Sequence, residues 1–190
     1  MELKGSQTEK NLLAAFAGES QARTRYTFFA SVARKEGYEQ ISAIFTETAD
    51  NEKEHGQLFF KHLKGGDAEI TAKYPAGVIA STAENLRAAA AGEKLEWGTL
   101  YPNFAEVAAR EGFRDVAATF RGVASVEVNH ERRYLRLLEN LEKGQVFKKP
   151  TRVRWKCRNC GNVIDSTEAP EKCPVCAHAR AYYELLAENY

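Results

Sequence analysis

The chain contains one internal repeat, and this repeat restricts its fold more than any other feature. The segment FFASVARKEGY (28–38) returns as NFAEVAAREGF (103–113), 75 residues later, and the tripeptide AGE at 17–19 returns at 91–93, 74 residues later. Phe45, Glu52 and His55 match Phe120, Glu127 and His130 at the 75-residue offset. A solvated charge run has no reason to recur in register with the apolar pattern. The repeat therefore singles out the Glu-x-x-His pair, whose two side chains share one face of a helix.

Residues 6–144 read as helix almost throughout. Helices are expected over 6–37, 38–66, 81–112 and 113–144; capping boxes Ser6-x-x-Glu9 and Ser81-x-x-Glu84 open the first and third, and glycines end the helices. The segment GDAEITAKYPAG (66–77) carries turn signals. Short links within each helix pair and one long crossover between the pairs describe a mainly α, ferritin-like four-helix bundle.

The third helix contains an irregularity. One residue is inserted between Glu93 and Tyr101 relative to the first half, close to Pro102. An extra residue inside a continuing helix is typical of a π-bulge, and proline removes a backbone donor. The sequence therefore predicts a local break in the α-helical ladder between Glu96 and Tyr101.

Each half supplies one isolated glutamate and one Glu-x-x-His pair. Four carboxylates and two imidazoles from four helices form the ligand set of di-iron and di-manganese bundles. Four buried carboxylates without a cation would take up protons, whereas two divalent metals bring +4 against −4. The sequence therefore predicts a two-metal site made of Glu19, Glu52, His55, Glu93, Glu127 and His130.

Glu96 breaks the symmetry of the two halves. It lies three residues after Glu93, where the first half has Ala22. It is either a surface residue or a fifth carboxylate that would favour more positive, oxidised metals. The matched Tyr26 and Tyr101 are candidate hydrogen-bond partners of the ligand carboxylates, with an aromatic core role as the alternative. Other candidates, His62, Trp97, Phe59 and Phe60, are interpreted as packing or surface residues.

The C-terminal part has a different composition. After Gly144, apolar residues recur at every second position (Val153, Trp155 and Cys157), as in a β-strand. Two Cys-x-x-Cys turns, Cys157/Cys160 and Cys173/Cys176, are found in the same region. Four thiolates in two such turns make a tetrahedral site for zinc or for a single iron, and His178 is expected to stay outside it. We therefore expect two domains, a bundle over 1–149 and a small, β-rich four-cysteine metal domain over 150–190.

Composition restricts the kinds of binding partner and the cellular location that can be expected. There are 27 basic and 26 acidic residues, so the net charge of +1 argues against nucleic acid or an acidic membrane as the main partner. No apolar run approaches the roughly 20 residues of a membrane helix, and the polar N-terminus carries no signal-like segment. Clustered cysteines favour metal binding in a reducing compartment, so a cytoplasmic location is expected.

The whole chain resembles the rubrerythrin family. The resemblance is carried by FAGESQA (16–22), ETADNEKEH (47–55), AAAGEKLEW (89–97), VEVNH (126–130) and CRNCG…APEKCPVCAH (157–178). It implies a ferritin-like di-iron domain followed by a rubredoxin-like domain with one iron bound by four cysteines, and zinc can replace iron at either site.

The same resemblance implies a function. Rubrerythrins are peroxidases that reduce hydrogen peroxide to water in oxidative-stress defence. It implies that Glu96 and His55 exchange as ligands between the oxidised and reduced states, with Tyr26 and Tyr101 as candidate proton carriers. It further implies a head-to-tail homodimer that takes electrons from a reductase or a free rubredoxin.

Two other classes of protein remain open from the residues. An iron-oxidising or iron-storage protein would share the bundle ligands but has no use for a four-cysteine electron carrier. A zinc-ribbon interaction protein would bind zinc in its tail and have a merely structural bundle.

Overall fold

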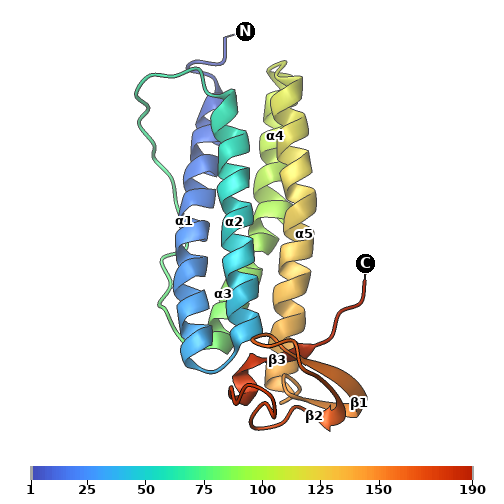
Figure 1. Ribbon diagram of the computed structural model, residues 1–190. Coiled ribbons are helices and arrows are strands. Elements are labelled where there is room, and N and C mark those ends of the chain that lie inside the picture. Colours follow the sequence, from blue (N-terminus) through green and yellow to red (C-terminus); the bar gives the residue numbers. More distant parts are fainter. Residues whose placement is uncertain (1, 190) are drawn as a thin grey trace.

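The computed structural model describes residues 2–189 and shows a long helical bundle with a small β module at one end (Figure 1). The helices are α1 (Gln7–Lys35), α2 (Glu39–His62), α3 (Thr82–Leu95), α4 (Tyr101–Arg110) and α5 (Arg114–Glu142). A π-helical segment, η1 (Glu96–Leu100), joins α3 to α4, so that α3, η1 and α4 form one continuous third helix of the bundle. The expected mainly α, ferritin-like architecture is confirmed.

The two hairpin turns have the same backbone conformation. Gly37 and Gly112 adopt φ of +85° and +88°, a left-handed region that glycine reaches without strain. The N–H of the residue after each glycine bonds to a carbonyl in the last helical turn, Tyr38 to Ala33 O and Phe113 to Ala108 O, both at 2.8 Å. The duplicated EG(Y/F) sequence therefore produces two equivalent helix stops.

The predicted irregularity in the third helix is confirmed. The N–H of Tyr101 bonds to the carbonyl of Glu96, five residues back, where an α-helix would use the residue four back. Pro102 follows at the start of α4, a position that tolerates the missing N–H. The bulge places Glu96 and Tyr101 on either side of the inserted residue.

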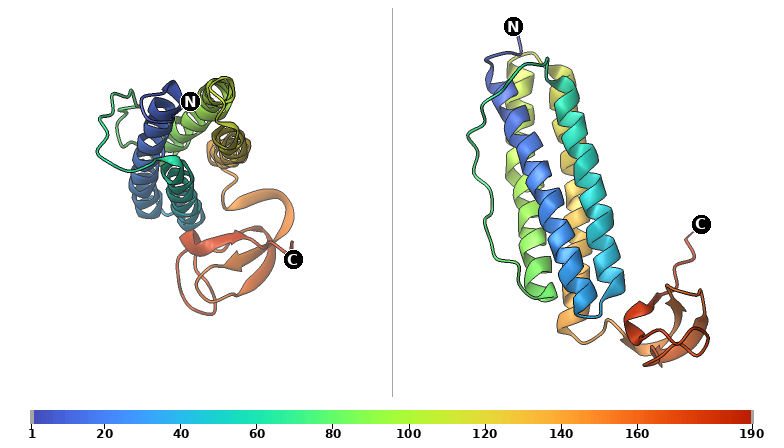
Figure 2. Two further views of the ribbon diagram at one scale, coloured as in Figure 1. Left: turned by 90° about the horizontal axis from the view of Figure 1, so that it is seen from above. Right: turned by 60° about the vertical axis from the view of Figure 1, so that its left-hand side comes forward.

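Residues 63–81 form the crossover between the two hairpins. The segment is extended, without regular secondary structure, and runs along the bundle beside α1 from the end of α2 to the start of α3 (Figure 2). Ser81 then begins α3 with the predicted capping box, since its side chain and that of Glu84 each accept from the other's backbone N–H.

The cap of α1 differs from the predicted capping box in one bond. The Ser6 hydroxyl accepts from the N–H of Glu9 at 3.0 Å, as expected. The Glu9 carboxylate reaches one residue further back and accepts from the N–H of Gly5 at 2.6 Å. The N–H of Ser6 bonds to the carbonyl of Leu3 instead, so it has no need of the Glu9 side chain.

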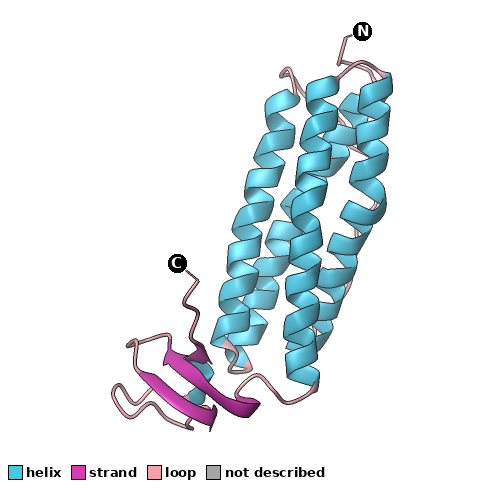
Figure 3. Cartoon of the chain, turned by 90° about the vertical axis from the view of Figure 1, so that its right-hand side faces the viewer, coloured by secondary structure: helices cyan, strands magenta, loops and turns pink. Residues whose placement is uncertain are grey.

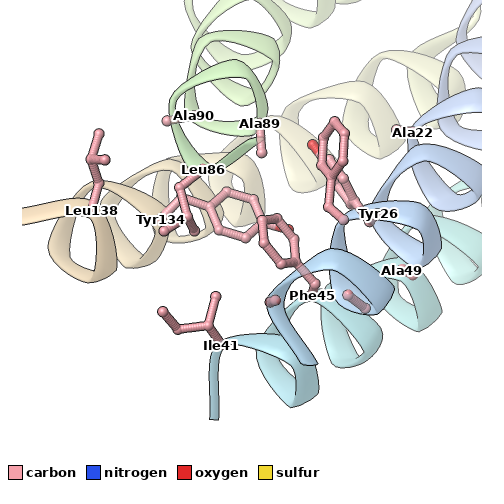
Figure 4. Packing of buried hydrophobic residues seen from close by; sticks show 13 residues of the cluster. Ala22, Tyr26, Ile41, Phe45, Ala49, Leu86, Ala89, Ala90, Tyr134 and Leu138 are labelled. Carbon is pink, nitrogen blue, oxygen red and sulfur yellow. The ribbon is translucent and has the colours of Figure 1, made fainter. Parts of the chain in front are cut away.

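The bundle core consists of two apolar clusters. One contains Tyr26, Phe45, Leu86 and Tyr134, which meet from four helices (Figure 4). The other contains Leu12, Phe59, Tyr101, Phe120 and Val123. The buried acidic and imidazole side chains lie along the same helices between the residues of these clusters.

The β module is a three-stranded antiparallel sheet in the order β2-β1-β3 (Figure 3). Its strands are β1 (Lys148–Cys157), β2 (Val163–Glu168) and β3 (Tyr183–Leu185), with a short 3-10 helix, η2 (Arg180–Tyr182), before β3. Strand β1 begins at Lys148, so the boundary expected at 149/150 falls just inside it, and the division into two domains stays a prediction.

The module contacts the bundle at the start of α2. The rings of Tyr38 and Phe147 stack with centroids 6.0 Å apart, and an ideal Cβ on Gly37 would lie 3.8 Å from that of Ala181. No helix formed by the described residues combines the length and apolar character needed to cross a lipid bilayer.

Candidate metal centres

The six predicted bundle ligands converge in the interior. Glu19 lies on α1, Glu52 and His55 on α2, Glu93 on α3, and Glu127 and His130 on α5. All six are buried; the glutamates are at most 1% exposed and the histidines 4–6%. Helical spacing explains this placement, because each Glu-x-x-His pair lies on the core-facing side of its helix.

Their ligand atoms form two groups that share two residues. In each group, one atom per residue lies within 4.8 Å of the others. The first group is Glu19, Glu52, His55 and Glu127, and the second is Glu52, Glu93, Glu127 and His130. Glu52 and Glu127 therefore stand between two neighbouring positions, as carboxylates that bridge a metal pair do.

The histidines face both bridging carboxylates. Nδ1 of His55 lies 2.9 Å from Glu52 and 2.8 Å from Glu127. Nδ1 of His130 lies 3.2 Å from Glu52 and 2.6 Å from Glu127. Each imidazole thus presents its Nδ1 to the space between the two carboxylates.

Buried atoms without partners fit a pair of metal ions. Within the described residues, Oε2 of Glu19 and Oε2 of Glu93 lack a hydrogen-bond partner, and the oxygens of Glu127 face only Nδ1 of the two histidines. Such orphaned buried acceptors are costly and rare in folded proteins. Two divalent cations would neutralise the four carboxylates and coordinate these free atoms, so the donor set fits a di-iron carboxylate site.

The protonation of the metal-free cluster shows the same charge problem. Burial, followed by repulsion from Glu96 and Glu52, raises the pKa of Glu19 well above its usual value. Burial raises the pKa of Glu93 to about 8, against hydrogen bonding from His130. Burial lowers the pKa of His130, but hydrogen bonds to Glu127 and Glu52 outweigh it and raise that pKa to about 12. Without metal, protons hold this cluster together.

Glu96 lies beside the cluster rather than inside either group. It is 9% exposed on η1, and burial followed by the charge of Glu93 raises its pKa well above the usual value. The structure therefore brings this fifth carboxylate next to the predicted ligands without making it a member of the two ligand groups.

The matched tyrosines donate hydrogen bonds across the repeat. The Tyr26 hydroxyl donates to Oε1 of Glu93, and the Tyr101 hydroxyl donates to Oε1 of Glu19, both at 2.5 Å. Both rings are also part of the apolar clusters. Each glutamate that belongs to only one ligand group is thus oriented by a phenol from the other half of the chain.

One contact next to the site was missed at the sequence level. Trp97, expected to be a packing or surface residue, is partly buried; its Nε1–H donates to Glu131 at 2.7 Å and its ring lies under the Lys94 ammonium, 3.6 Å from the centroid. Each of these three residues directly follows a predicted site residue. This adjacency in the sequence could have drawn attention to the three residues, but it does not tell which way their side chains point. Phe59 packs in the core, and His62 contacts Thr119 at 2.8 Å.

The four cysteines form the second centre. One Sγ from each lies within 4.8 Å of the others, and none is in a disulfide. Gly161 (φ +78°) and Ala177 (φ +61°) close the two turns, each donating its N–H to the carbonyl of the first cysteine. His178 is not part of the group; its Nδ1 lies 3.2 Å from the carbonyl of Cys176. Two such turns present four sulfurs tetrahedrally to one ion.

Comparisons with known proteins agree with this two-centre architecture. The family model described as Rubrerythrin matches residues 10–138, and the model described as Rubrerythrin, rubredoxin-like domain, matches residues 155–184. The chain belongs to the rubrerythrin family. The family assignment places a ferritin-like di-iron site in the bundle and a rubredoxin-like four-cysteine site in the module, as the grouped side chains do.

Similar proteins include other rubrerythrins over nearly their full length. The chain is 63% identical to a rubrerythrin of Porphyromonas gingivalis over 99% of this chain and 94% of the relative. It is 53% identical to a rubrerythrin of Nitratidesulfovibrio vulgaris over 99% and 98%. Among solved structures, the partially reduced state of nigerythrin is 31% identical, with a TM-score of 0.64 over 96% of this chain and 87% of that one.

Proposed function

We propose that this rubrerythrin-family protein is a non-haem di-iron peroxidase that reduces hydrogen peroxide to water as a defence against oxidative stress. The observation that carries the proposal is the pairing of two centres in one chain. Two ligand groups that share Glu52 and Glu127 suit a two-electron reaction, and a four-cysteine site suits a one-electron carrier that resupplies it.

The bundle residues have distinct roles in this reaction. When bound, the iron pair supplies the two electrons that break the O–O bond. Glu52 and Glu127 would hold both metal positions, while Glu19 and Glu93 would each hold one and are fixed by Tyr101 and Tyr26. The tyrosine hydroxyls that donate to these carboxylates are buried next to the site, which supports the two tyrosines as proton carriers.

Glu96 and His55 are proposed as alternative ligands. A carboxylate favours the more positive oxidised pair, and a neutral imidazole suits the reduced one. Glu96 lies on the π-helical segment, and its charge acts on Glu19 as well as on Glu93 in the metal-free cluster. Glu19 shares its ligand group with His55, which supports Glu96 and His55 as ligands on the same side of the site.

Electron delivery favours a second copy of the chain. The β module contacts the bundle at Tyr38, and His55 lies 17 residues further along α2 (55 − 38), a helical rise of roughly 25 Å. The module is therefore far from the metal site of its own chain. We propose a head-to-tail homodimer in which the four-cysteine centre of one subunit serves the other and is itself reduced by a reductase or rubredoxin.

The test is an anaerobic reoxidation experiment. The fully reduced protein, mixed with one equivalent of hydrogen peroxide per iron pair, is expected to lose its diferrous signature rapidly and leave no peroxide. A protein that stays reduced contradicts the peroxidase proposal. A double variant, Cys160→Ser with Cys173→Ser, is expected to keep this single turnover but lose continuous turnover with a reductase.

The same samples address the alternatives. Rapid peroxide consumption coupled to reoxidation of the four-cysteine iron contradicts a storage role, which would not use that centre. A red, iron-loaded module with thiolate charge-transfer bands contradicts a zinc-ribbon interaction protein, whose module would be colourless.

A further inference from the structure

A cavity of about 270 Å³ lies between α1, the crossover and the third helix. We call it the crossover pocket, and its lining includes Gly18, Tyr26, Tyr74, Glu96, Leu100 and Phe104. Tyr101 also lines it. The pocket therefore reaches Glu96 and both tyrosines that bond to ligand carboxylates, so it lies beside the metal site.

Small residues on the helices create the space. An ideal Cβ on Gly18 would meet no atom within 4 Å, although this glycine directly precedes Glu19. Ala14, Ala15 and Ala22 line the same side. Glycine is less favourable than alanine inside a helix, so the sequence accepts a local cost at position 18. The missing side chain leaves this side of the pocket open.

The lining combines apolar side chains with one buried carboxyl group. Leu95, Leu100, Phe104 and the ring of Tyr74 supply apolar surface. Glu96 supplies the carboxyl group, and it is 9% exposed.

The volume exceeds what hydrogen peroxide needs. A water molecule occupies about 30 Å³ of liquid, so the pocket holds several molecules of that size. Small-molecule sites typically combine an apolar lining with a few polar groups. We infer that the crossover pocket binds small alkyl hydroperoxides, with the –OOH group at Glu96 and the alkyl group against Leu100 and Phe104.

This inference rests on the proposed peroxidase function and extends its substrate class. The O–O bond of ROOH breaks, two electrons come from the reduced metal pair and two protons are taken up, which gives the alcohol ROH and water. The reaction uses the same electrons as hydrogen peroxide reduction and needs no additional reductant.

The test compares two peroxides in the reduced holoprotein. Hydrogen peroxide and tert-butyl hydroperoxide are each mixed anaerobically with the wild type, Gly18→Leu and the control Gly122→Leu. Gly122 is an exposed helical glycine on α5 with no atom within 4 Å of its ideal Cβ, so it matches Gly18 outside the pocket. A leucine at 18 would occupy the space intended for the alkyl group.

The expected result is a selective loss of the reaction with the larger peroxide in Gly18→Leu. In Gly18→Leu, the rate with tert-butyl hydroperoxide falls about tenfold or more relative to the rate with hydrogen peroxide, the scale of a steric clash in a substrate pocket. Gly122→Leu behaves as the wild type with both peroxides.

A binding measurement accompanies the rates. Saturation-transfer NMR on the oxidised holoprotein with tert-butyl alcohol, the product, is expected to show methyl contact in the wild type and Gly122→Leu and none in Gly18→Leu. If hydrogen peroxide reoxidises the wild type but tert-butyl hydroperoxide does not, or if Gly18→Leu keeps both the rate and the NMR contact, the inference is wrong and the proposed function stands. If hydrogen peroxide itself fails, the proposed function is wrong as well.

Discussion

Tyr26 and Tyr101 show how single residues connect the two halves of the site. Each tyrosine lies on the helix that carries one isolated glutamate but donates to the isolated glutamate of the other half. The duplication of Tyr was visible in the sequence, and so was a carboxylate partner. The exchange between halves was not, because it depends on how α1 packs against the third helix.

Replacing one of these phenols should weaken metal retention. Tyr26→Phe keeps the ring in the core but removes the donor to Glu93, and the loss of such an outer hydrogen bond typically lowers metal affinity by roughly 10–100-fold. The measurement is iron release to a competing chelator, followed per site. The matched control is Tyr134→Phe, since the Tyr134 ring contacts Tyr26 but its hydroxyl bonds to none of the ligand carboxylates among the described residues. Equal iron release from both variants would contradict a role for the Tyr26 hydroxyl.

Removal of the bundle metals should make stability fall as pH rises. In the metal-free protein the pKa of Glu19 and that of Glu96 are raised, that of Glu93 is about 8 and that of His55 is about 9. The folded state then binds more protons than the unfolded state, so stability is lost between about pH 5 and 9. Glu127, whose pKa is lowered by its hydrogen bonds to the histidines despite burial, acts in the opposite direction.

Scanning calorimetry of the metal-free protein across this range measures the effect. We expect a Tm that declines with pH and a smaller decline in Glu96→Gln, which removes one of the titrating carboxyls. A Tm that rises steadily from about pH 5 to 8 would contradict the proton-held cluster. The metal-loaded protein, in which cations replace the protons, serves as the control.

Among the secondary-structure elements, η1 is the one in which sequence reasoning and structure agree in most detail. The extra residue between Glu93 and Tyr101 sufficed to predict the irregularity, because the flanking repeats fix the register on both sides. The helices and the converging ligands also followed from periodicity and duplication. The Trp97–Glu131 bond, the position of the crossover and the pocket beneath it did not, since they depend on packing between segments that share no pattern.

The Trp97 side chain should hold η1 in place. Trp97→Phe keeps an aromatic ring for Lys94 but removes the hydrogen bond to Glu131, a loss of about 1 kcal/mol in the free energy of unfolding. Faster hydrogen exchange is expected at the η1 amides in the variant, measured by mass spectrometry. Phe113→Leu, in the turn between α4 and α5, is the control and should leave exchange at η1 unchanged. Unchanged η1 exchange in Trp97→Phe would show that the bond does not anchor the segment.

At the scale of the whole molecule, each half caps a helix of the other. The Glu111 carboxylate accepts from the N–H groups of Gln7 and Thr8 at the start of α1, at 3.2 and 2.8 Å. Its counterpart Glu36 accepts from the N–H of Thr82 at the start of α3, at 3.0 Å. Both caps satisfy free backbone donors and place a negative charge at a helix N-terminus. The caps and the exchanged tyrosines join the two hairpins at their ends and at their centre.

Removing either cap should lower the Tm at neutral pH. Glu111→Gln and Glu36→Gln lose the charge at the helix end, and because the two sites are far apart the effects should add in the double variant. Hydrogen bonds from Thr8 lower the pKa of Glu111, so its contribution is present at neutral pH and is lost as pH falls below the usual carboxyl range. Thermal unfolding at neutral and acidic pH measures this, with the exposed Glu106→Gln as control. A Glu111→Gln deficit that persists undiminished in acid would contradict the charge-based cap.

The β module should depend on its metal while the bundle does not. Two of the five residues in the module's buried cluster, Cys157 and Cys173, are themselves metal ligands, and the others are Trp155, Ala169 and Tyr183. A core this small does not stabilise about forty residues without a cross-link or a bound metal, so binding of the ion and folding are coupled.

In a Trp97→Phe background, which leaves Trp155 as the single tryptophan, titration of the thiolates with a mercurial reagent is expected to shift the fluorescence of the fully buried Trp155 to the red. The far-UV helical signal should persist, because the two bundle clusters contain no cysteine. Loss of helix in step with the Trp155 shift would mean that the bundle and the module fold as one unit, and that the two-domain division is wrong.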